Sequence, residues 1–259
     1  MMDWTHDFFI NKGQLWLMVM KDRWQYGKRD ANWVAKILKK FDLHRGKVLE
    51  LGCGNGRVCI PLAKKGYEVT GVDISPMYIE DARKMAKRNK VIARFLVGDI
   101  REIDKLLEGE QFDAIISIWT TIGYYDKATD EEIFTKVSQL CKKGGLLMVL
   151  ATQSKEKLSK IFWPTHYEET QQFVILHQAK FDHIRSIHED RWLFYRKEGR
   201  DLKFVDALEL KLRIYSQQEL IDMVERVGFE LIEAYDKLWG LTPVTPESGI
   251  NMVFRKVRR

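Results

Sequence analysis

The sequence lacks the long apolar run of a membrane-spanning segment. No stretch of its 259 residues approaches the roughly 18 apolar residues that cross a bilayer as a helix. The most apolar run near the N-terminus, Leu15 to Met20, has Lys12 before it and Lys21 after it, and it is too short for the core of a signal peptide. We therefore expect no membrane partner, and we expect this run to form one turn of a buried helix.

Cysteine is scarce, and neither repeats nor low-complexity segments are present. Cys53, Cys59 and Cys141 form no Cys-x-x-Cys pair, and their odd number argues against a disulfide framework. A reducing compartment, the cytoplasm, is the simplest expectation. With 45% apolar and 31% charged residues, the composition is that of a globular protein.

Positive charge is concentrated at the two ends of the chain. The net charge is +6, and residues 1–47 carry ten Lys and Arg against five Asp. The last five residues add Arg255, Lys256, Arg258 and Arg259. This distribution is a weak indication of an anionic partner such as RNA, because a modest charge excess also serves solubility alone.

Strand-like and helix-like runs alternate between residues 47 and 151. Apolar runs predict strands at 47–51, 68–73, 93–97, 112–118 and 146–151. Helical patterns at 57–65, 76–89 and 129–141 separate most of them, the last opened by a capping box at Thr129 and Glu132 and broken by Gly144-Gly145. Alternation of this kind predicts a parallel sheet with right-handed crossovers.

The alternation of strand-like and helix-like runs ends after residue 151. Three longer strand-like runs with short turns between them predict an inserted antiparallel β cap, at 173–181, 184–196 and 202–214. Ser216 and Glu219 then form a second capping-box pattern that opens a helix, and strands follow at 229–235 and 250–257. We thus expect an N-terminal helical lid over 1–46, a main domain made of 47–151 and 216–259, and the cap over 152–215.

A glycine-rich turn connects the first strand to its helix, in the run Glu50-Leu51-Gly52-Cys53-Gly54-Asn55-Gly56. Glycine lets the backbone turn sharply and approach a ligand, and a helix N-terminus offers unpaired N–H groups. The spacing differs from the dinucleotide fingerprint of NAD-dependent enzymes, which are the main alternative for the fold. Glu50 would repel a pyrophosphate, but its carboxylate suits a cationic amino group. An ordinary strand–helix turn would not require the acidic residues that follow.

Two more carboxylates come at the ends of the next two strands. Asp73 lies 21 residues after Gly52, where a carboxylate can accept hydrogen bonds from ribose hydroxyls. Asp99 follows the third strand and could accept the amine of an adenine, with Ile74 and Ile100 flanking the ring. The ligand described in this way has a ribose, an adenine and an ammonium group, but no phosphate.

These motifs resemble those of the class I S-adenosylmethionine-dependent methyltransferases. The resemblance rests on ELGCGNG, GVDIS, VGDI, FDAIISIWTTIGYYD and CKKGGLLMVL; it covers residues 45–151 well and 216–257 loosely. It implies an α/β fold, with a seven-stranded, mostly parallel Rossmann-like sheet, helices on both faces and an antiparallel last strand. Lys143-Gly144-Gly145 stands where many relatives have Pro-Gly-Gly.

The resemblance also implies S-adenosylmethionine as the cofactor. It assigns the methionine part to Glu50 and the glycine turn, the ribose to Asp73, and the adenine to Asp99 with Ile100. The full set of expected cofactor residues is Trp24, Glu50, Gly52, Cys53, Gly54, Asn55, Gly56, Asp73, Ile74, Met77, Asp99, Ile100 and Ile118.

The methyl acceptor should meet the segment after the fourth strand, Ser117 to Asp126. Its pattern resembles methyltransferases that modify amine nitrogens of small molecules, and it lacks the (Asp/Asn/Ser)-Pro-Pro-(Tyr/Phe) motif of most nucleobase amino-methyltransferases. Hydroxyls of Thr120 and Thr121 could localise an amine lone pair, and Tyr124 and Tyr125 could stack on the acceptor or pack against the cap. These four are the candidate catalytic residues.

Three functions remain open from the sequence. Basic and aromatic residues interleave at 21–29 and 191–197, as in proteins that bind single-stranded nucleic acid, which favours an exocyclic base amine of RNA, ribosomal RNA included. The alternative is a small-molecule amine N-methyltransferase, with the cap closing over the acceptor; the N-terminal helix could serve as a lid or as a dimer surface. A non-catalytic binding module is disfavoured by the intact acidic residues. His166, His177, His183 and His188 match no zinc spacing, so we predict no metal, although one of them could act as a general base.

Overall fold

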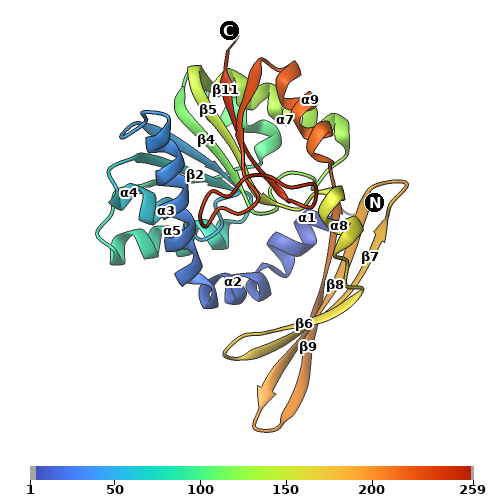
Figure 1. Ribbon diagram of the computed structural model, residues 1–259. Helices are drawn as coiled ribbons and strands as arrows, with labels where there is room; N and C mark the ends of the chain where they lie inside the picture. The colour runs from blue at the N-terminus through green and yellow to red at the C-terminus, as the bar shows by residue number, and fades with distance from the viewer. Residues whose placement is uncertain (1–3, 258–259) are drawn as a thin grey trace.

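A seven-stranded sheet lies between two layers of helices in the computed structural model, which describes residues 4–257 (Figure 1). The order of its strands is β10-β11-β5-β4-β1-β2-β3. Strands β1 to β5 run parallel, and β11 runs antiparallel to both of its neighbours. The expected fold class is confirmed. These strands are β1 (Lys47–Leu51), β2 (Glu68–Asp73), β3 (Arg94–Val97), β4 (Phe112–Ile118), β5 (Cys141–Thr152), β10 (Phe229–Ala234) and β11 (Ile250–Lys256).

The strands are apolar because both faces of the sheet are covered. Along β1, Val48 packs into the cluster on one face and Leu49 into the cluster on the other. Helices α3 (Trp24–Lys40), α4 (Cys59–Lys64) and α5 (Pro76–Arg88) cover the first face. Helices α6 (Ile103–Leu106), α7 (Lys127–Leu140) and α9 (Gln217–Arg226) cover the second, and the 3-10 turn η2 (Ile100–Glu102) precedes α6.

A second, antiparallel sheet projects from the first as a long twisted ribbon (Figure 1). Its strands are, in spatial order, β6 (Thr165–Glu169), β7 (Phe173–Asp182), β8 (Ile187–Glu198) and β9 (Asp201–Arg213). Helix α8 (Lys155–Lys160) leads into it. Neither α8 nor β6 was expected from the sequence. No residue of β6 is fully buried, so the strand carries no run of apolar residues that would have revealed it.

The N-terminal elements fill the angle between the two sheets. They are α1 (Trp4–His6), the π-helix η1 (Asp7–Asn11) and α2 (Gly13–Asp22). Phe8, Leu15 and Val19 pack against the inner face of the second sheet, where Ile175 and Phe194 lie. The apolar run from Leu15 to Met20 is thus a buried helical segment, as expected. None of the helices formed by residues 4–257 is long and apolar enough to span a membrane.

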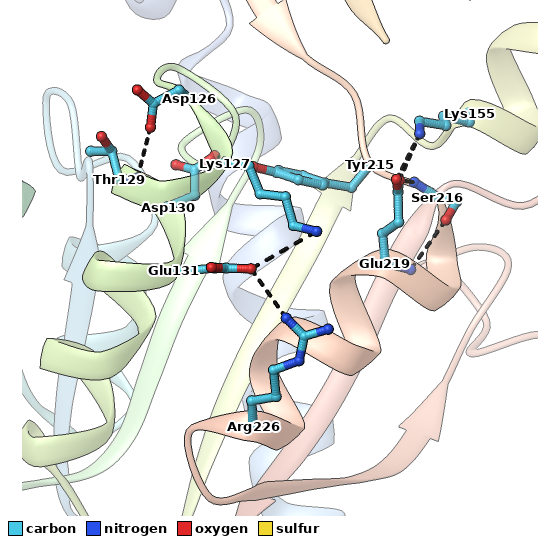
Figure 2. Close-up of polar contacts among 10 residues, drawn as sticks. All are labelled: Asp126, Lys127, Thr129, Asp130, Glu131, Lys155, Tyr215, Ser216, Glu219 and Arg226. Atoms are coloured by element: carbon cyan, nitrogen blue, oxygen red, sulfur yellow. Dashed lines mark hydrogen bonds and ion pairs between the residues drawn. The ribbon is translucent and has the colours of Figure 1, made fainter. Parts of the chain in front are cut away.

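The two predicted capping boxes had different outcomes. Ser216 and Glu219 form the predicted box at the start of α9 (Figure 2). The box predicted at Thr129 is wrong: α7 already begins at Lys127, and its cap is Asp126, whose Oδ1 accepts the N–H of Thr129 at 2.8 Å. Helix α7 then ends at Leu140, before the two glycines, because strand β5 begins directly at Cys141.

Helices α7 and α9 are joined by polar contacts (Figure 2). The carboxylate of Glu131 lies 3.9 Å from Nζ of Lys127 and 3.3 Å from Nη1 of Arg226. The hydroxyl of Tyr215 donates to Oδ2 of the buried Asp130 at 2.6 Å. Tyr215 lies two residues after the end of β9. This bond therefore attaches the end of the second sheet to α7, the helix that follows the predicted acceptor segment.

Candidate functional site

A cleft opens at the carboxyl ends of β1, β2, β3 and β4. The connection from β1 leads to β2 on one side, whereas β4 lies on the other side of β1, and such a switch point is where open α/β sheets bind ligands. Most of the residues predicted from the sequence line this cleft. They are Glu50, Gly52, Cys53, Gly54, Asp73, Ile74, Asp99, Ile100, Ile118, Thr120, Thr121, Tyr124 and Tyr125.

Four predicted cofactor residues do not line the cleft. Trp24 is partly buried and packs against the apolar cluster beneath α3. Asn55 is fully buried, and its amide nitrogen lies 3.4 Å from Oδ2 of Asp81. Gly56 lies against the ring of Phe95, and Met77 is partly exposed on α5.

Glycine is required in the turn after β1 for steric reasons. Gly52 and Gly54 have φ angles of +64° and +54°, in the left-handed region. A Cβ on Gly54 would lie 2.8 Å from Sδ of Met20 in α2, and one on Gly52 would lie 2.8 Å from Cγ2 of Thr121. The turn therefore passes directly under α2 and beside the end of β4, and it leaves its backbone against the cleft.

Glu50 is a carboxylate without a strong cationic partner. It is 3% exposed, and burial raises its pKa from 4.5 to about 7, a rise that the thiol of Cys59 and the charge of Arg57 oppose. The Cys59 thiol donates to Oε2 at 2.8 Å. A cationic group that entered the cleft beside Glu50 would stabilise its ionised form.

Asp73 holds the glycine turn and keeps part of its hydrogen-bonding capacity. Its Oδ2 accepts the N–H of Gly54 at 2.8 Å, and its Oδ1 accepts the N–H of Ser75 at 2.9 Å. Burial nevertheless raises its pKa to about 6. A carboxylate accepts about four hydrogen bonds, so two positions remain for hydroxyl donors.

Asp99 is fixed at the rim of the cleft by Arg101. Its Oδ1 accepts the N–H of Arg101 at 2.8 Å, and its Oδ2 accepts from the guanidinium at 2.6 Å. The same guanidinium lies 4.4 Å from the ring centroid of Tyr125. The carboxylate of Asp99 and the ring of Tyr125 are therefore held on either side of one cation.

Arg57 also lines the cleft, although no role was predicted for it from the sequence. Its guanidinium lies 4.8 Å from the ring centroid of Trp119, and the charges of Asp30 and Glu50 favour its protonated form while burial lowers its pKa. The site thus contains a cation and a carboxylate whose charges influence each other, although the two groups form no ion pair within 4 Å. The signal was a basic residue directly after the glycine motif.

The N-terminal wall of the cleft was also missed in its details. Thr5, Phe9, Trp16 and Met20 line the cleft together with Tyr78 of α5. The sequence contained a signal in the aromatic residues that crowd its first sixteen positions, but their distance along the chain from the acceptor segment concealed the contact.

Tyr124 joins this wall to the acceptor segment. Its ring centroid lies 5.3 Å from that of Phe9 and 5.4 Å from that of Trp4, whose Nε1 donates to the Tyr124 carbonyl at 3.1 Å. Thr121 is directed differently: it is buried, and its hydroxyl donates to the Leu51 carbonyl at 3.3 Å, which ties β4 to β1. Of the two threonines, Thr120 is the partly exposed one.

Comparison with known proteins identifies the domain that contains the glycine turn. Residues 48–145 match the family model described as a methyltransferase domain. The Bacillus subtilis protein YqeM, which is named as a methyltransferase, is 29% identical over 205 residues, 78% of this chain and 78% of that protein. This chain carries a class I S-adenosylmethionine-dependent methyltransferase domain. S-adenosylmethionine is its cofactor.

Proteins similar to this chain are named for different acceptors. The ubiquinone biosynthesis O-methyltransferase of Mesorhizobium japonicum is 31% identical over 104 residues, 40% of this chain and 39% of that enzyme. The S-adenosylmethionine-bound structure of an amino pentose methyltransferase from Micromonospora echinaspora superposes with a TM-score of 0.71, covering 93% of this chain and 96% of that one. Its sequence identity is 16%, so this second likeness establishes a shared fold.

The residues of the cleft fit this cofactor. Two buried carboxylates, Glu50 and Asp73, lie where an ammonium and a ribose need acceptors, and neither forms an ion pair with a described lysine or arginine within 4 Å. The glycine turn leaves space that a Cβ would fill. Among the described residues that line the cleft, Arg57 is the one lysine or arginine, whereas Glu50, Asp73 and Asp99 are carboxylates that would repel a pyrophosphate.

Proposed function

We propose that this methyltransferase transfers a methyl group to the amine nitrogen of a small molecule. The observation that carries the proposal is the aromatic wall of the cleft, in which Phe9 and Trp16 face the same cavity as Tyr124. The first two come from the N-terminal elements and the third from the segment after β4, so the acceptor side is enclosed by two distant parts of the chain. An enclosed aromatic cavity suits a small acceptor better than a polymer.

Aromatic side chains favour an amine acceptor over a deprotonated hydroxyl group. An amine nitrogen becomes cationic as it takes the methyl group, whereas a hydroxylate loses its charge. Ring faces attract cations by about 0.5–2 kcal/mol, so Phe9, Trp16 and Tyr124 would stabilise the charge that develops in N-methylation. Burial raises the pKa of the Tyr124 hydroxyl, which keeps it neutral and able to hydrogen-bond.

The cofactor supplies an activated methyl group on its sulfonium, so the chain has to position groups and exclude water. In our proposal, Glu50 holds the ammonium of the methionine part and Arg57 its carboxylate. Asp73 accepts from the ribose, and Asp99 with Ile100 holds the adenine. Thr120 accepts the N–H of an incoming neutral amine and directs its lone pair. Among the described residues that line the cleft there is no histidine, so none of the cap histidines is proposed as the base.

The basic segment at 21–29 gives less support to an RNA acceptor than its sequence indicated. Lys21 pairs with Asp81 at 3.0 Å, Arg29 with Asp30 at 3.4 Å, and Arg23 with Glu168. Trp24 is partly buried and packs against the apolar core, whereas Tyr26 is exposed. Three positive charges of the segment therefore have acidic partners within the chain, and one of its two aromatic rings is partly covered.

Several residues of the other two basic segments also contact the protein itself. On the cap, Phe194 is fully buried and Lys197 pairs with Glu169 at 2.5 Å. At the C-terminal end, Lys256 is 5% exposed and Arg255 lies 5.6 Å from the ring centroid of Phe41, while Arg258 and Arg259 lie outside the described residues. RNA methylation is therefore the competing outcome of the test below.

One labelling experiment separates the two acceptors. The protein is incubated with methyl-labelled S-adenosylmethionine and a metabolite extract, total RNA or ribosomal subunits, at about 50 and 200 mM salt, because binding to a polyanion weakens steeply over that range. We expect label in the small-molecule fraction at both salt concentrations. Label only in RNA or ribosomes would overturn the proposal.

A matched pair of variants tests the aromatic wall. Trp16→Ala removes a ring that lines the cleft, whereas Trp239→Ala removes one that is 57% exposed outside it. We expect the first to lower turnover of the labelled acceptor at least tenfold with little change in cofactor affinity, and the second to change neither. Equal effects of both variants would contradict a role of the wall in acceptor binding.

We also propose the cytoplasm as the compartment of the enzyme. Cys53, Cys59 and Cys141 are all free and buried, and Cys53 and Cys59 lie close together without forming a disulfide. Free cysteines close enough to contact each other are typical of a reducing compartment. Fractionation of cells with an antibody to the protein would test this.

A further inference from the structure

Three side chains with metal-binding atoms converge on the inner face of the second sheet. His166 and His177 are directly opposed across β6 and β7, and Glu168 lies two residues further along β6 on the same face. One ligand atom from each residue lies within 4.8 Å of the others. Residues 11 positions apart match no zinc spacing along a chain, but an antiparallel pair of strands brings them together.

His177 is oriented as a metal ligand. It is 3% exposed, and its Nδ1 lies 2.9 Å from Oδ2 of Asp190, which also accepts from Nε1 of Trp192 at 2.6 Å. Because a carboxylate only accepts, the neutral form of this ring carries its proton on Nδ1 and its lone pair on Nε2. That atom is buried, finds no hydrogen-bond partner among the described residues, and lies 3.9 Å from Oε2 of Glu168.

We propose that His166, Glu168 and His177 bind a divalent transition-metal ion, with Zn²⁺ as the best match. Two imidazole nitrogens and one carboxylate oxygen suit zinc and its neighbours, whereas Ca²⁺ and Mg²⁺ prefer oxygen ligands alone. Asp190 acts as the positioning residue, because a carboxylate that accepts the second N–H of a histidine fixes the ring and makes it more basic. The unpartnered Nε2 of His177 is the atom that an ion would satisfy.

Metal binding requires one imidazole ring to turn. The rings of His166 and His177 are stacked, with centroids 4.2 Å apart and planes within 8°. An ion must lie in the plane of each ring that binds it, and two parallel stacked planes do not share such a position. His166 is the ring that turns, because it lies half-buried on the edge strand β6, and its Nδ1 also has no partner among residues 4–257.

Arg23 competes with the ion for Glu168. Its guanidinium bonds Oε2 of that carboxylate, and it stands between α2 and α3. An ion that binds Glu168 would displace this charge. The site also neighbours the cofactor cleft: the ring centroid of Trp192 lies 4.9 Å from that of His177 and 5.2 Å from that of Trp16, which lines the cleft. Metal binding would thereby replace one contact between the cap and the N-terminal elements, the Arg23–Glu168 bond, and leave the ring contacts of Trp192 in place.

The test measures the metal itself and does not depend on methyl transfer. Chelator-treated protein is titrated with Zn²⁺ by calorimetry and with Co²⁺ by visible absorption, which reports nitrogen and oxygen ligation directly. We expect one ion per chain. His177→Ala and Glu168→Gln should each weaken binding by at least about tenfold, and Asp190→Asn by about 10–100-fold. Arg23→Gln should tighten binding, because it removes a competing charge.

Matched controls lie on the same sheet. His183→Ala changes an exposed histidine in the turn after β7, and Glu169→Gln changes an exposed carboxylate next to Glu168. We expect both to bind as the parent protein does, and circular dichroism identifies any variant that fails to fold. Glu168 is partly exposed, so Glu168→Gln remains informative if His177→Ala does not fold. Absence of Co²⁺ absorption, or equal affinities for His177→Ala and His183→Ala, would overturn the proposal.

Discussion

The thiol of Cys59 and the carboxylate of Glu50 share a buried hydrogen bond, with Sγ and Oε2 2.8 Å apart. It is the strongest partner that lowers the pKa of Glu50, which burial raises to about 7. The carboxylate that we assign to the ammonium of the cofactor is therefore only partly ionised at neutral pH. Cofactor binding and protonation compete at this residue.

We expect S-adenosylmethionine to bind more tightly as pH rises from 6 to 8, because ionised Glu50 attracts its ammonium. Glu50→Gln should weaken binding by about 10–100-fold at pH 8, the size of a lost charge-assisted hydrogen bond, and should remove the pH dependence. Cys59→Ala should move the midpoint of the dependence to higher pH, because it removes a donor to the ionised form. Calorimetric titrations at several pH values check this, with Cys141→Ala as the control. Unchanged pH dependence in Glu50→Gln would contradict the assignment.

The stability of the cofactor-free protein should fall as pH rises, whereas its affinity for the cofactor should increase. The pKa of Glu50 is higher in the folded state than its ordinary value of 4.5, so folding is favoured most while the group is protonated. The free energy of unfolding should fall as pH rises from about 4.5 to 7. Glu50→Gln should reduce this fall and be more stable than the parent at pH 8, by on the order of 1–3 kcal/mol. Urea unfolding at pH 5 and pH 8 measures the difference.

Gly123 should be much less replaceable than Gly66. Both have φ angles in the left-handed region, +97° and +94°. A Cβ on Gly123 would lie 2.3 Å from the carbonyl oxygen of Arg213, whereas one on Gly66 has nothing within 4 Å. Gly66→Ala should cost about 1–2 kcal/mol of stability for the backbone conformation, and Gly123→Ala a further 1–3 kcal/mol for the clash. Thermal and urea unfolding compare them, and equal losses would show that the contact between the acceptor segment and β9 is readily adjusted.

Tyr215→Phe should destabilise the protein in a pH-dependent way. Burial raises the pKa of Asp130 to about 7, and the hydrogen bond from Tyr215 opposes that rise. Without the hydroxyl, the folded state holds its proton to higher pH, so stability continues to fall above pH 7. We expect a loss of about 1.5–3 kcal/mol at pH 8 and a smaller loss at pH 5.

Tyr67→Phe is the matched control for this prediction. Its hydroxyl donates to the carbonyl of Leu43 at 2.9 Å, and no carboxylate is involved. The loss of stability should be about 1 kcal/mol and independent of pH. A pH-independent loss in Tyr215→Phe as well would show that Asp130 is not the titrating partner.

Substitutions of the two threonines in the acceptor segment should have different effects, one on stability and the other on turnover. Thr121→Val removes a buried hydrogen bond to the Leu51 carbonyl and should cost about 1 kcal/mol of stability. Thr120→Val should leave stability and cofactor affinity nearly unchanged and lower kcat about tenfold or more, the effect of about 1.4 kcal/mol on the barrier. Unfolding curves and single-turnover kinetics on both variants check this. A Thr120→Val enzyme with full turnover would remove Thr120 from the proposed mechanism.

The sequence predicted best where burial is continuous. The bounds of β1, β2 and β4 agree with the predicted runs residue for residue, because these strands are covered on both faces and nearly all of their residues are buried. Strand β6 was missed since its residues alternate between exposed and half-buried positions at an edge. The predicted start of helix α7 lies too late in the chain, because Asp126 caps the helix in place of Thr129.

The same contrast holds for the site. Glu50, Asp73 and Asp99 were found because each ends a strand or directly follows one, where chemistry collects in parallel sheets. The aromatic wall and the opposed histidines were not found, because they depend on contacts between segments far apart in the chain or on strand register. Trp4 meets Tyr124 across 120 positions, and no local pattern encodes that contact.

The second sheet leaves the main fold and returns to it at almost the same point. The N–H of Lys155 donates to the carbonyl of Tyr215 at 3.1 Å, so the two ends of a segment of about sixty residues meet in one hydrogen bond. A graft of a different segment between these two residues would not have to alter the strands that form the cofactor cleft. Any segment exchanged at this point would still need an inner face that covers Phe8, Leu15 and Val19, because these side chains pack against the second sheet.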